Sequence, residues 1–79
     1  MIELAPGERI YVLAGAYRVA MDWARKQGLH RDQVVHLRDP IRQLQGAPRG
    51  LRYVVLYGGE RTQETRAYLA YREAVEVDP

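Results

Sequence analysis

The apolar run Ile10-Tyr11-Val12-Leu13-Ala14-Gly15 is the feature that most constrains how this chain folds. A short, unbroken run of this kind is typical of a strand buried on both faces in the middle of a parallel sheet. After this run the apolar residues recur with the period of a helix, which predicts an amphipathic helix over residues 16–27 that ends at Gly28. The expected apolar stripe of this helix consists of Tyr17, Ala20, Met21 and Ala24, bordered by Val19 and Trp23.

The same alternation of strand and helix recurs further along the chain. Val34–Leu37 is expected to form a second short strand. Asp39 and Pro40 follow it as an acidic N-cap and a proline at the first helical position, so they predict a short helix that ends at Gly46. A third apolar strand is expected over Leu51–Tyr57, and it too is followed by glycine.

A last helix is predicted over residues 63–75, with Thr62 as its N-cap and Glu64 near its positive end. Its expected buried stripe consists of Ala67, Tyr68, Tyr71, Ala74 and Val75. Tyrosines on helix stripes and strands are expected to fill the core, because the chain contains no phenylalanine. Residues 76–79 are expected to form a tail.

These elements together predict one three-layer α/β domain over residues 1–79. Right-handed crossovers from a central first strand give a small, mainly parallel, three-stranded sheet of order 2-1-3 with helices on both faces. Such an arrangement is similar to half of a Rossmann fold. Both edges of the sheet would remain open unless the N-terminal segment or another subunit covers them.

The composition excludes several classes of protein. A chain of 79 residues with 47% hydrophobic and 28% charged residues is globular, and it contains no cysteine for a disulfide or a thiolate metal site. Its core is thin, so self-association is a possible further source of stability. No apolar run approaches the ~20 residues of a membrane helix. We therefore expect a cytoplasmic protein without membrane contact and without a cofactor.

The loops after the expected strands are where an α/β sheet binds ligands. In this chain they contain a set of glycines and arginines that could hold an anion. These candidates are Gly15, Arg38, Gly58, Gly59 and Arg61. However, the chain has neither a dinucleotide-binding fingerprint nor a phosphate loop, and glycine after a strand is also ordinary turn chemistry. No nucleophile–base pair, no paired carboxylates and no metal-ligand spacing of His30 and His36 is evident, so catalysis is not expected.

Basic residues are concentrated in the middle of the chain. Arg25, Lys26, Arg31, Arg38, Arg42, Arg49 and Arg52 stand there against Asp32 and Asp39. A basic face could follow a nucleic-acid backbone, but these cations lie on several elements and can equally form a solvated surface. Trp23 is either part of the core or an anchor for a partner. The candidate interaction residues are therefore Trp23, Arg42, Arg49 and Arg52.

Several short motifs resemble a group of small α/β proteins encoded by tailed phages, especially those of actinobacteria. They are Val12–Gly15, Ala24 with Gly28-Leu29, Asp39-Pro40 with Leu44-Gln45-Gly46, and Val54–Gly58. The resemblance spans residues 10–59. It implies a phage accessory protein in the cytoplasm of the host cell, with a host or phage protein as partner. The group has no assigned activity, so the resemblance carries over no functional residue.

Residues 39–57 are also similar to the strand arrangement of helicase and terminase ATPase cores. In those cores a Leu-Arg-Gly stretch precedes a strand that ends in Asp-Glu. Here the stretch is Leu44-Gln45-Gly46, and the strand ends in Tyr57-Gly58-Gly59. The acids that would hold magnesium and activate water are absent from these positions, which argues against ATP hydrolysis.

The sequence thus favours a non-enzymatic protein-interaction module that binds another protein or itself. One alternative is a nucleic-acid-binding protein that uses the basic region 25–52. The other is a protein that binds a nucleotide or a phosphate-bearing ligand in the loops after the strands.

Overall fold

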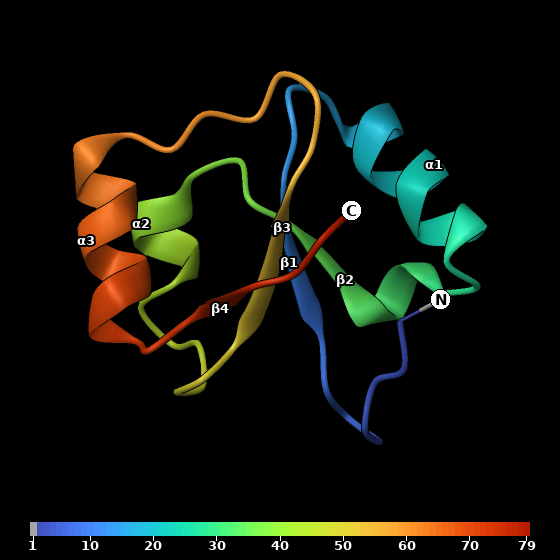
Figure 1. Cartoon of the computed structure of the whole chain (residues 1–79), viewed down its shortest axis with the longest axis horizontal. Coiled ribbons are helices and arrows are strands. Elements are labelled where there is room, and N and C mark those ends of the chain that lie inside the picture. The colour runs from blue at the N-terminus through green and yellow to red at the C-terminus, as the bar shows by residue number, and fades with distance from the viewer. Residues whose placement is uncertain (1) are drawn as a thin grey trace.

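Strands and helices alternate along the chain in the computed structural model, which describes residues 2–79 (Figure 1). The elements are β1 (Ile10–Leu13), α1 (Tyr17–Lys26), a 3-10 turn (Arg31–Gln33), β2 (Val34–His36), α2 (Pro40–Gln43), β3 (Arg52–Val55), α3 (Gln63–Tyr71) and β4 (Val75–Glu76). The fold is therefore of the predicted α/β class.

The sheet is parallel throughout, and its strands lie in the order β2-β1-β3-β4. Ile10 of β1 lies opposite Val34 of β2 on one side and opposite Arg52 of β3 on the other. The apolar run Ile10–Leu13 thus forms an interior strand between β2 and β3, and the predicted order 2-1-3 is confirmed. The direction in which the chain winds reverses at β1, because β2 and β3 lie on opposite sides of it.

The C-terminal end of the chain corrects the prediction. The expected helix over residues 63–75 ends at Tyr71, and Val75 and Glu76 form a fourth strand instead of belonging to the helix and the tail. Glu73 adopts a left-handed φ of 54°, which turns the chain back toward the sheet. The Val75 N–H then donates to the Leu51 carbonyl over 2.8 Å, which fixes β4 against β3. A strand of two residues carries no sequence period by which it could be recognised.

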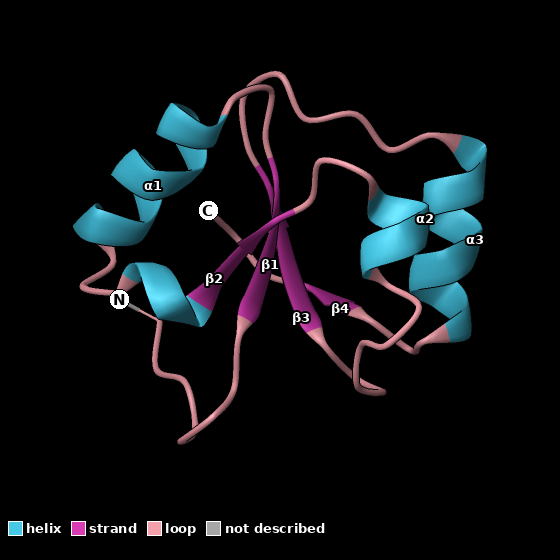
Figure 2. Ribbon diagram, turned by 180° about the vertical axis from the view of Figure 1, so that it is seen from behind, coloured by secondary structure: helices cyan, strands magenta, loops and turns pink. Residues whose placement is uncertain are grey.

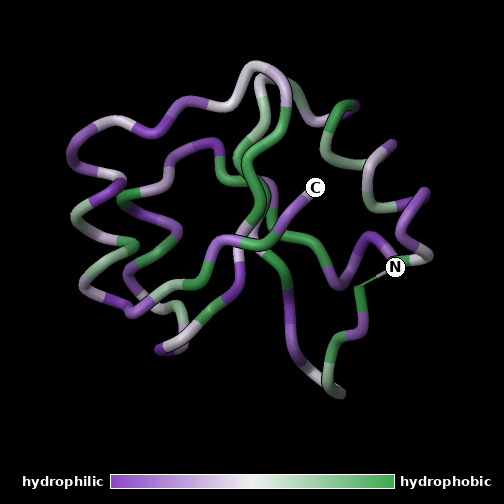
Figure 3. Tube along the Cα trace, in the orientation of Figure 1, coloured by the Kyte–Doolittle hydropathy of each residue, from purple (hydrophilic) through white to green (hydrophobic). Residues whose placement is uncertain are grey.

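Three layers are formed, because α1 covers one face of the sheet while α2 and α3 cover the other (Figure 2). Ile10, Val12 and Val54 belong to the cluster on the α1 side. Tyr11 and Leu13 belong to the cluster on the α2 and α3 side. This alternation follows from the period of two along a strand. The hydropathy of the chain shows the same arrangement, with apolar residues along the central strands (Figure 3).

The helix α1 lies within the predicted range 16–27, with Ala16 and Gln27 as its caps, and it ends as predicted before Gly28. Gly28 adopts a φ of 73°, and the Leu29 N–H donates to the Ala24 carbonyl over 2.9 Å, which closes the last turn. The buried residues of this helix are Ala20, Trp23 and Ala24. Tyr17 is 54% exposed, so its expected place in the core is wrong. It lies in the first turn of α1, where its ring stands edge-on to His36 of β2 with the ring centroids 6.1 Å apart.

The start of α2 differs from the expected cap. Pro40 occupies the first helical position as predicted, but the Asp39 side chain makes no capping hydrogen bond. The side chain of Gln43 instead binds the segment before the helix, because its Oε1 accepts from the backbone N–H groups of Arg38 and Asp39 at 2.7 and 2.8 Å. Its Nε2 donates to the His36 carbonyl at 3.0 Å. Gln43 therefore joins the end of β2 to the start of α2.

The helix α3 begins as predicted and is rotated relative to the prediction. The Thr62 hydroxyl accepts from the Thr65 N–H over 3.1 Å, which confirms the N-cap. Thr65 and Leu69 are the buried residues of this helix, whereas Ala67 and Tyr71 of the expected stripe are exposed. Tyr68 and Ala74 of that stripe are partly buried and pack against the core, so the predicted stripe is right only in part.

The N-terminal segment is fastened to β3 by an ion pair. Both oxygens of Glu8 accept from the Arg52 guanidinium at 2.9 Å, and one of them also accepts from the Ala5 N–H at 2.9 Å. Arg52 donates further to the Glu3 carbonyl at 2.8 Å. The hydrogen bond from Arg52, followed by that from the Ala5 N–H, holds the pKa of Glu8 below its usual value of 4.5.

This ion pair predicts a component of stability that is lost in acid. Because folding lowers the pKa of Glu8, its contribution is present above pH 4.5 and disappears as the pH falls through the folded-state pKa below that value. Glu8→Gln should lower the urea midpoint at about pH 7 and flatten its dependence on pH below about 4.5. The fluorescence of the single tryptophan, Trp23, reports the transition.

The matched control is Glu60→Gln, which removes an exposed carboxylate without an ion-pair partner in residues 2–79. It should leave the slope unchanged. An acid slope that is the same in Glu8→Gln and in the unsubstituted protein would contradict the prediction.

Candidate functional site

A tight turn after β3 dominates the end of the sheet where the strands terminate. The Gly59 N–H donates to the Leu56 carbonyl over 2.9 Å, so Tyr57 and Gly58 form the middle of a β-turn. Gly58 has the positive φ, 78°, that such a turn can require of its third residue. The Gly15 N–H donates to the Tyr57 carbonyl over 3.1 Å, which fastens the turn to the segment after β1.

Gly15 and Gly58 bring two segments of backbone into direct contact. A Cβ placed on Gly15 would lie 3.0 Å from the Gly58 Cα, and one placed on Gly58 would lie 2.9 Å from the Gly15 Cα. In open α/β sheets, ligands bind in the crevice where the strand order reverses, which here lies between β1 and β3. The two glycines fill this crevice with backbone. Their role here is close packing.

A cavity of about 450 Å³ lies beside this contact, over the ends of β1 and β2 and next to the first residues of α2 and α3. Of the five predicted anion-binding residues, Gly15, Arg38 and Gly58 line it. Gly59 packs against the Leu13 carbonyl instead. Arg61 is committed to an ion pair with Glu76 at 2.6 Å. The structure thus brings together three of the five candidates.

The polar groups of this carboxyl-edge cavity offer hydrogen bonds and balanced charge. The hydroxyls of Thr62 and Thr65 are 2.9 Å apart and share one hydrogen bond, so one O–H remains free for another acceptor. Arg38 and Glu60 both line the cavity, one with a positive and one with a negative charge. His36 Nε2 is 3.0 Å from the Ala14 carbonyl, and neither threonine hydroxyl is paired with it.

This set of groups contains no nucleophile held by a base. Within residues 2–79, no three His, Asp or Glu side chains converge to hold a metal ion. The polar groups that line the cavity can donate hydrogen bonds to a ligand and accept them from it.

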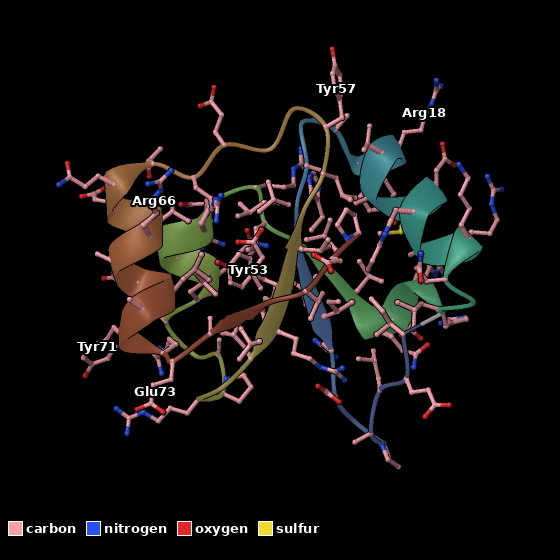
Figure 4. All side chains as sticks on the ribbon, in the orientation of Figure 1. Arg18, Tyr53, Tyr57, Arg66, Tyr71 and Glu73 are labelled. Atoms are coloured by element: carbon pink, nitrogen blue, oxygen red, sulfur yellow. The ribbon has the colours of Figure 1, made fainter. Side chains whose placement is uncertain are left out.

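Two exposed tyrosines lie close to the glycine contact along the chain, Tyr57 next to Gly58 and Tyr17 two residues after Gly15. Tyr57 is 89% exposed at its turn, and Tyr17 is 54% exposed at the start of α1. Figure 4 shows Tyr57 and Arg18 projecting outward from the same end of the molecule. We call Tyr17, Arg18 and Tyr57 the carboxyl-edge surface. The expectation that Tyr57 fills the core is wrong, because β3 ends at Val55 and Tyr57 belongs to the turn.

The predicted interaction residues have different surroundings. Trp23 is only 9% exposed and packs between α1 and the sheet, so the structure places it in the core and not on the surface. Arg52 is engaged by Glu8, and Arg49 lies 3.9 Å from Glu73 in a loose, exposed pair. Arg42 is exposed on α2. None of these four residues belongs to the carboxyl-edge surface.

The basic middle of the chain does not form one face. Arg25 pairs with Asp22 at 2.9 Å on α1, whereas Arg42 lies on α2, on the opposite side of the sheet. Arg49 and Arg52 have the acidic partners given above. Of the seven cations, Arg25, Arg49 and Arg52 therefore have an acidic neighbour.

The fold and the surface define the class of molecule as a small three-layer α/β protein with a central parallel sheet. The chain significantly matches no protein-family model, no curated protein and no solved structure. Among residues 2–79, no helix combines the length and the apolarity needed to cross a bilayer.

Proposed function

We propose that this chain is a non-enzymatic protein-interaction module that acts in the cytoplasm of a host cell, as expected of the phage accessory proteins that it resembles. The observation that carries the proposal is the exposure of Tyr57, of which 89% is open to solvent at a turn fixed by backbone contacts. The partner is a host or phage protein that buries this tyrosine.

The rigidity of the turn supports this role. Hydrogen bonds tie Leu56 to Leu13 at 2.8 Å and Gly15 to Tyr57 at 3.1 Å, so little backbone freedom is left to lose on binding. A tyrosine also has few rotatable bonds relative to the area that it can bury. Tyrosine and arginine are side chains enriched at the energetic centres of interfaces. Arg18 projects from the same end of the molecule as Tyr57 (Figure 4).

A protein partner is favoured over nucleic acid because of the charges. Aromatic rings with an arginine could also stack on bases, but single-strand binding relies on a positively charged groove. The cations at Arg25, Arg49 and Arg52 all have acidic neighbours. Binding of nucleic acid is therefore one of the outcomes that the test distinguishes.

The test is quantitative affinity capture from the cells that naturally contain the chain, with nuclease-treated extracts and several baits compared. Proteins retained by the unsubstituted chain should be lost with Tyr57→Ala, because truncating a central tyrosine costs on the order of 2 kcal/mol or more of binding. Tyr57→Phe keeps the ring and should retain most of them. Tyr71→Ala removes another exposed tyrosine, which lies at the far end of α3 in Figure 4, and is the matched control.

Two outcomes would overturn the proposal. One is the same set of captured proteins with Tyr57→Ala as with the unsubstituted chain. The other is binding of a single-stranded oligonucleotide at about 50 mM salt that Tyr57→Ala abolishes, which would assign the surface to nucleic acid.

A further inference from the structure

A second large cavity, of about 420 Å³, lies at the opposite end of the sheet, where the strands begin. One wall is the N-terminal segment from Pro6 to Arg9, and the other is the loop from Pro48 to Leu51 that precedes β3. Tyr11 of β1 also lines it. Cavities of 300–1,000 Å³ are typical of small-molecule sites. We call this space the amino-edge cavity.

Tyr11, which lines this cavity, has a hydroxyl without a hydrogen-bond partner within residues 2–79. The residue is only 8% exposed, yet no hydrogen bond within residues 2–79 engages its hydroxyl, and the oxygen is not sealed from solvent. Tyr53, which is equally buried, donates its hydroxyl to Glu76 at 3.3 Å. A buried tyrosine normally finds a hydrogen-bond partner. The open cavity is therefore the place where an acceptor for the Tyr11 hydroxyl can bind.

Two guanidinium groups flank the same space. Arg9 is exposed and has no ion-pair partner in residues 2–79. Arg49 has only the loose contact with Glu73 at 3.9 Å, in which both side chains are 69% exposed. Such an exposed pair is weak and easily exchanged for a better acceptor.

The one carboxylate that lines the cavity does not oppose an anion strongly. Both oxygens of Glu8 accept from Arg52, and one accepts from the Ala5 N–H as well. The charge of Glu8 is thus largely neutralised by its own partner. The other cations of the cavity are Arg9 and Arg49, of which Arg49 keeps its loose contact with Glu73.

We propose that the amino-edge cavity binds a phosphate group, held by Arg9, Arg49 and the Tyr11 hydroxyl. Guanidinium groups match the oxygens of a phosphate in charge and in planar fork geometry, and a phenolic O–H supplies a further donor. Pro6, Pro48 and Leu51 form apolar walls that can accept the organic part of a phosphate ester. The site is separate from the carboxyl-edge surface and does not rest on the function proposed for it.

The experiment is a titration of the isotope-labelled full chain followed by amide NMR shifts, with inorganic phosphate, a phosphate monoester, acetate and chloride at matched ionic strength. Inorganic phosphate should shift the amides of residues 7–11 and 49–51, and acetate or chloride should shift them far less. Tighter binding of the monoester would indicate an organic phosphate as the natural ligand. Equal binding would indicate the free ion.

Three variants identify the groups responsible. Tyr11→Phe deletes only the hydroxyl and should weaken phosphate binding about tenfold while leaving the unfolding midpoint unchanged. Arg9→Gln and Arg49→Gln should each weaken it about tenfold or more. Arg42→Gln removes an exposed arginine that does not line the cavity and is the matched control.

The proposal is overturned if phosphate causes no shifts beyond those of chloride. It is also overturned if Arg42→Gln reduces binding as much as Arg9→Gln, which would indicate only general attraction of anions to a basic chain. A Tyr11→Phe variant that binds phosphate normally but is less stable would assign the hydroxyl to the fold and remove it from the site.

Discussion

Replacing Gly59 with alanine is expected to destabilise the protein by about 3 kcal/mol or more, which is a large part of the stability of a domain of this size. The added Cβ would lie 2.4 Å from the Leu13 carbonyl oxygen and 2.7 Å from its carbon. Both atoms belong to backbone that cannot give way easily, because the Leu13 carbonyl accepts from the Leu56 N–H over 2.8 Å. The contact can be relieved only by separating the turn from β1.

Urea denaturation followed by Trp23 fluorescence measures this loss, and Gly46→Ala is its matched control. A Cβ on Gly46 would meet no atom within 4 Å, and its φ is not positive. That variant should therefore change the free energy of unfolding by no more than about 0.5 kcal/mol. Equal midpoints for the two variants would contradict the packing described for Gly59. Because the same turn carries Tyr57, a folded Gly59→Ala variant should also bind its partner less well.

Arg72→Met is expected to lower the free energy of unfolding by about 2–3 kcal/mol. Its guanidinium donates to the Ala47 carbonyl at 3.1 Å and also to the Gln45 carbonyl. These bonds hold the loop between α2 and β3 against the end of α3. Methionine keeps much of the apolar stem but leaves both carbonyls without their charged donor.

Two further variants separate this role from the general effect of losing a charge. Arg66→Met removes an exposed arginine from the same helix and should change the unfolding free energy by less than about 0.5 kcal/mol. Arg72→Lys should recover only part of the loss, because one ammonium group cannot reproduce the fork of a guanidinium. Full stability of Arg72→Met in thermal and urea unfolding would show that the hydrogen bonds from Arg72 to this loop do not stabilise the protein.

Only part of the two candidate sites could be predicted from the sequence. The dipeptide Gly58-Gly59 marks a turn, so the displacement of Tyr57 from β3 into that turn could have been read from it. The contact between Gly15 and Gly58 could not be predicted from the sequence, because it joins residues far apart in the chain. Likewise, the sequence places Tyr11 and Arg49 on separate elements, and only the sheet brings both to the amino-edge cavity.

The sequence by itself determined the alternation of strands and helices, the central place of Ile10–Leu13, and the boundaries of α1 with its glycine end. These features depend on side-chain periods and terminal residues, which act over a few neighbouring positions. The tertiary structure alone decided that α3 is buried through Leu69, that Trp23 lies in the core, and that Val75 and Glu76 add a fourth strand. Those features depend on which surfaces meet, and that is set by packing between distant segments rather than by any local pattern.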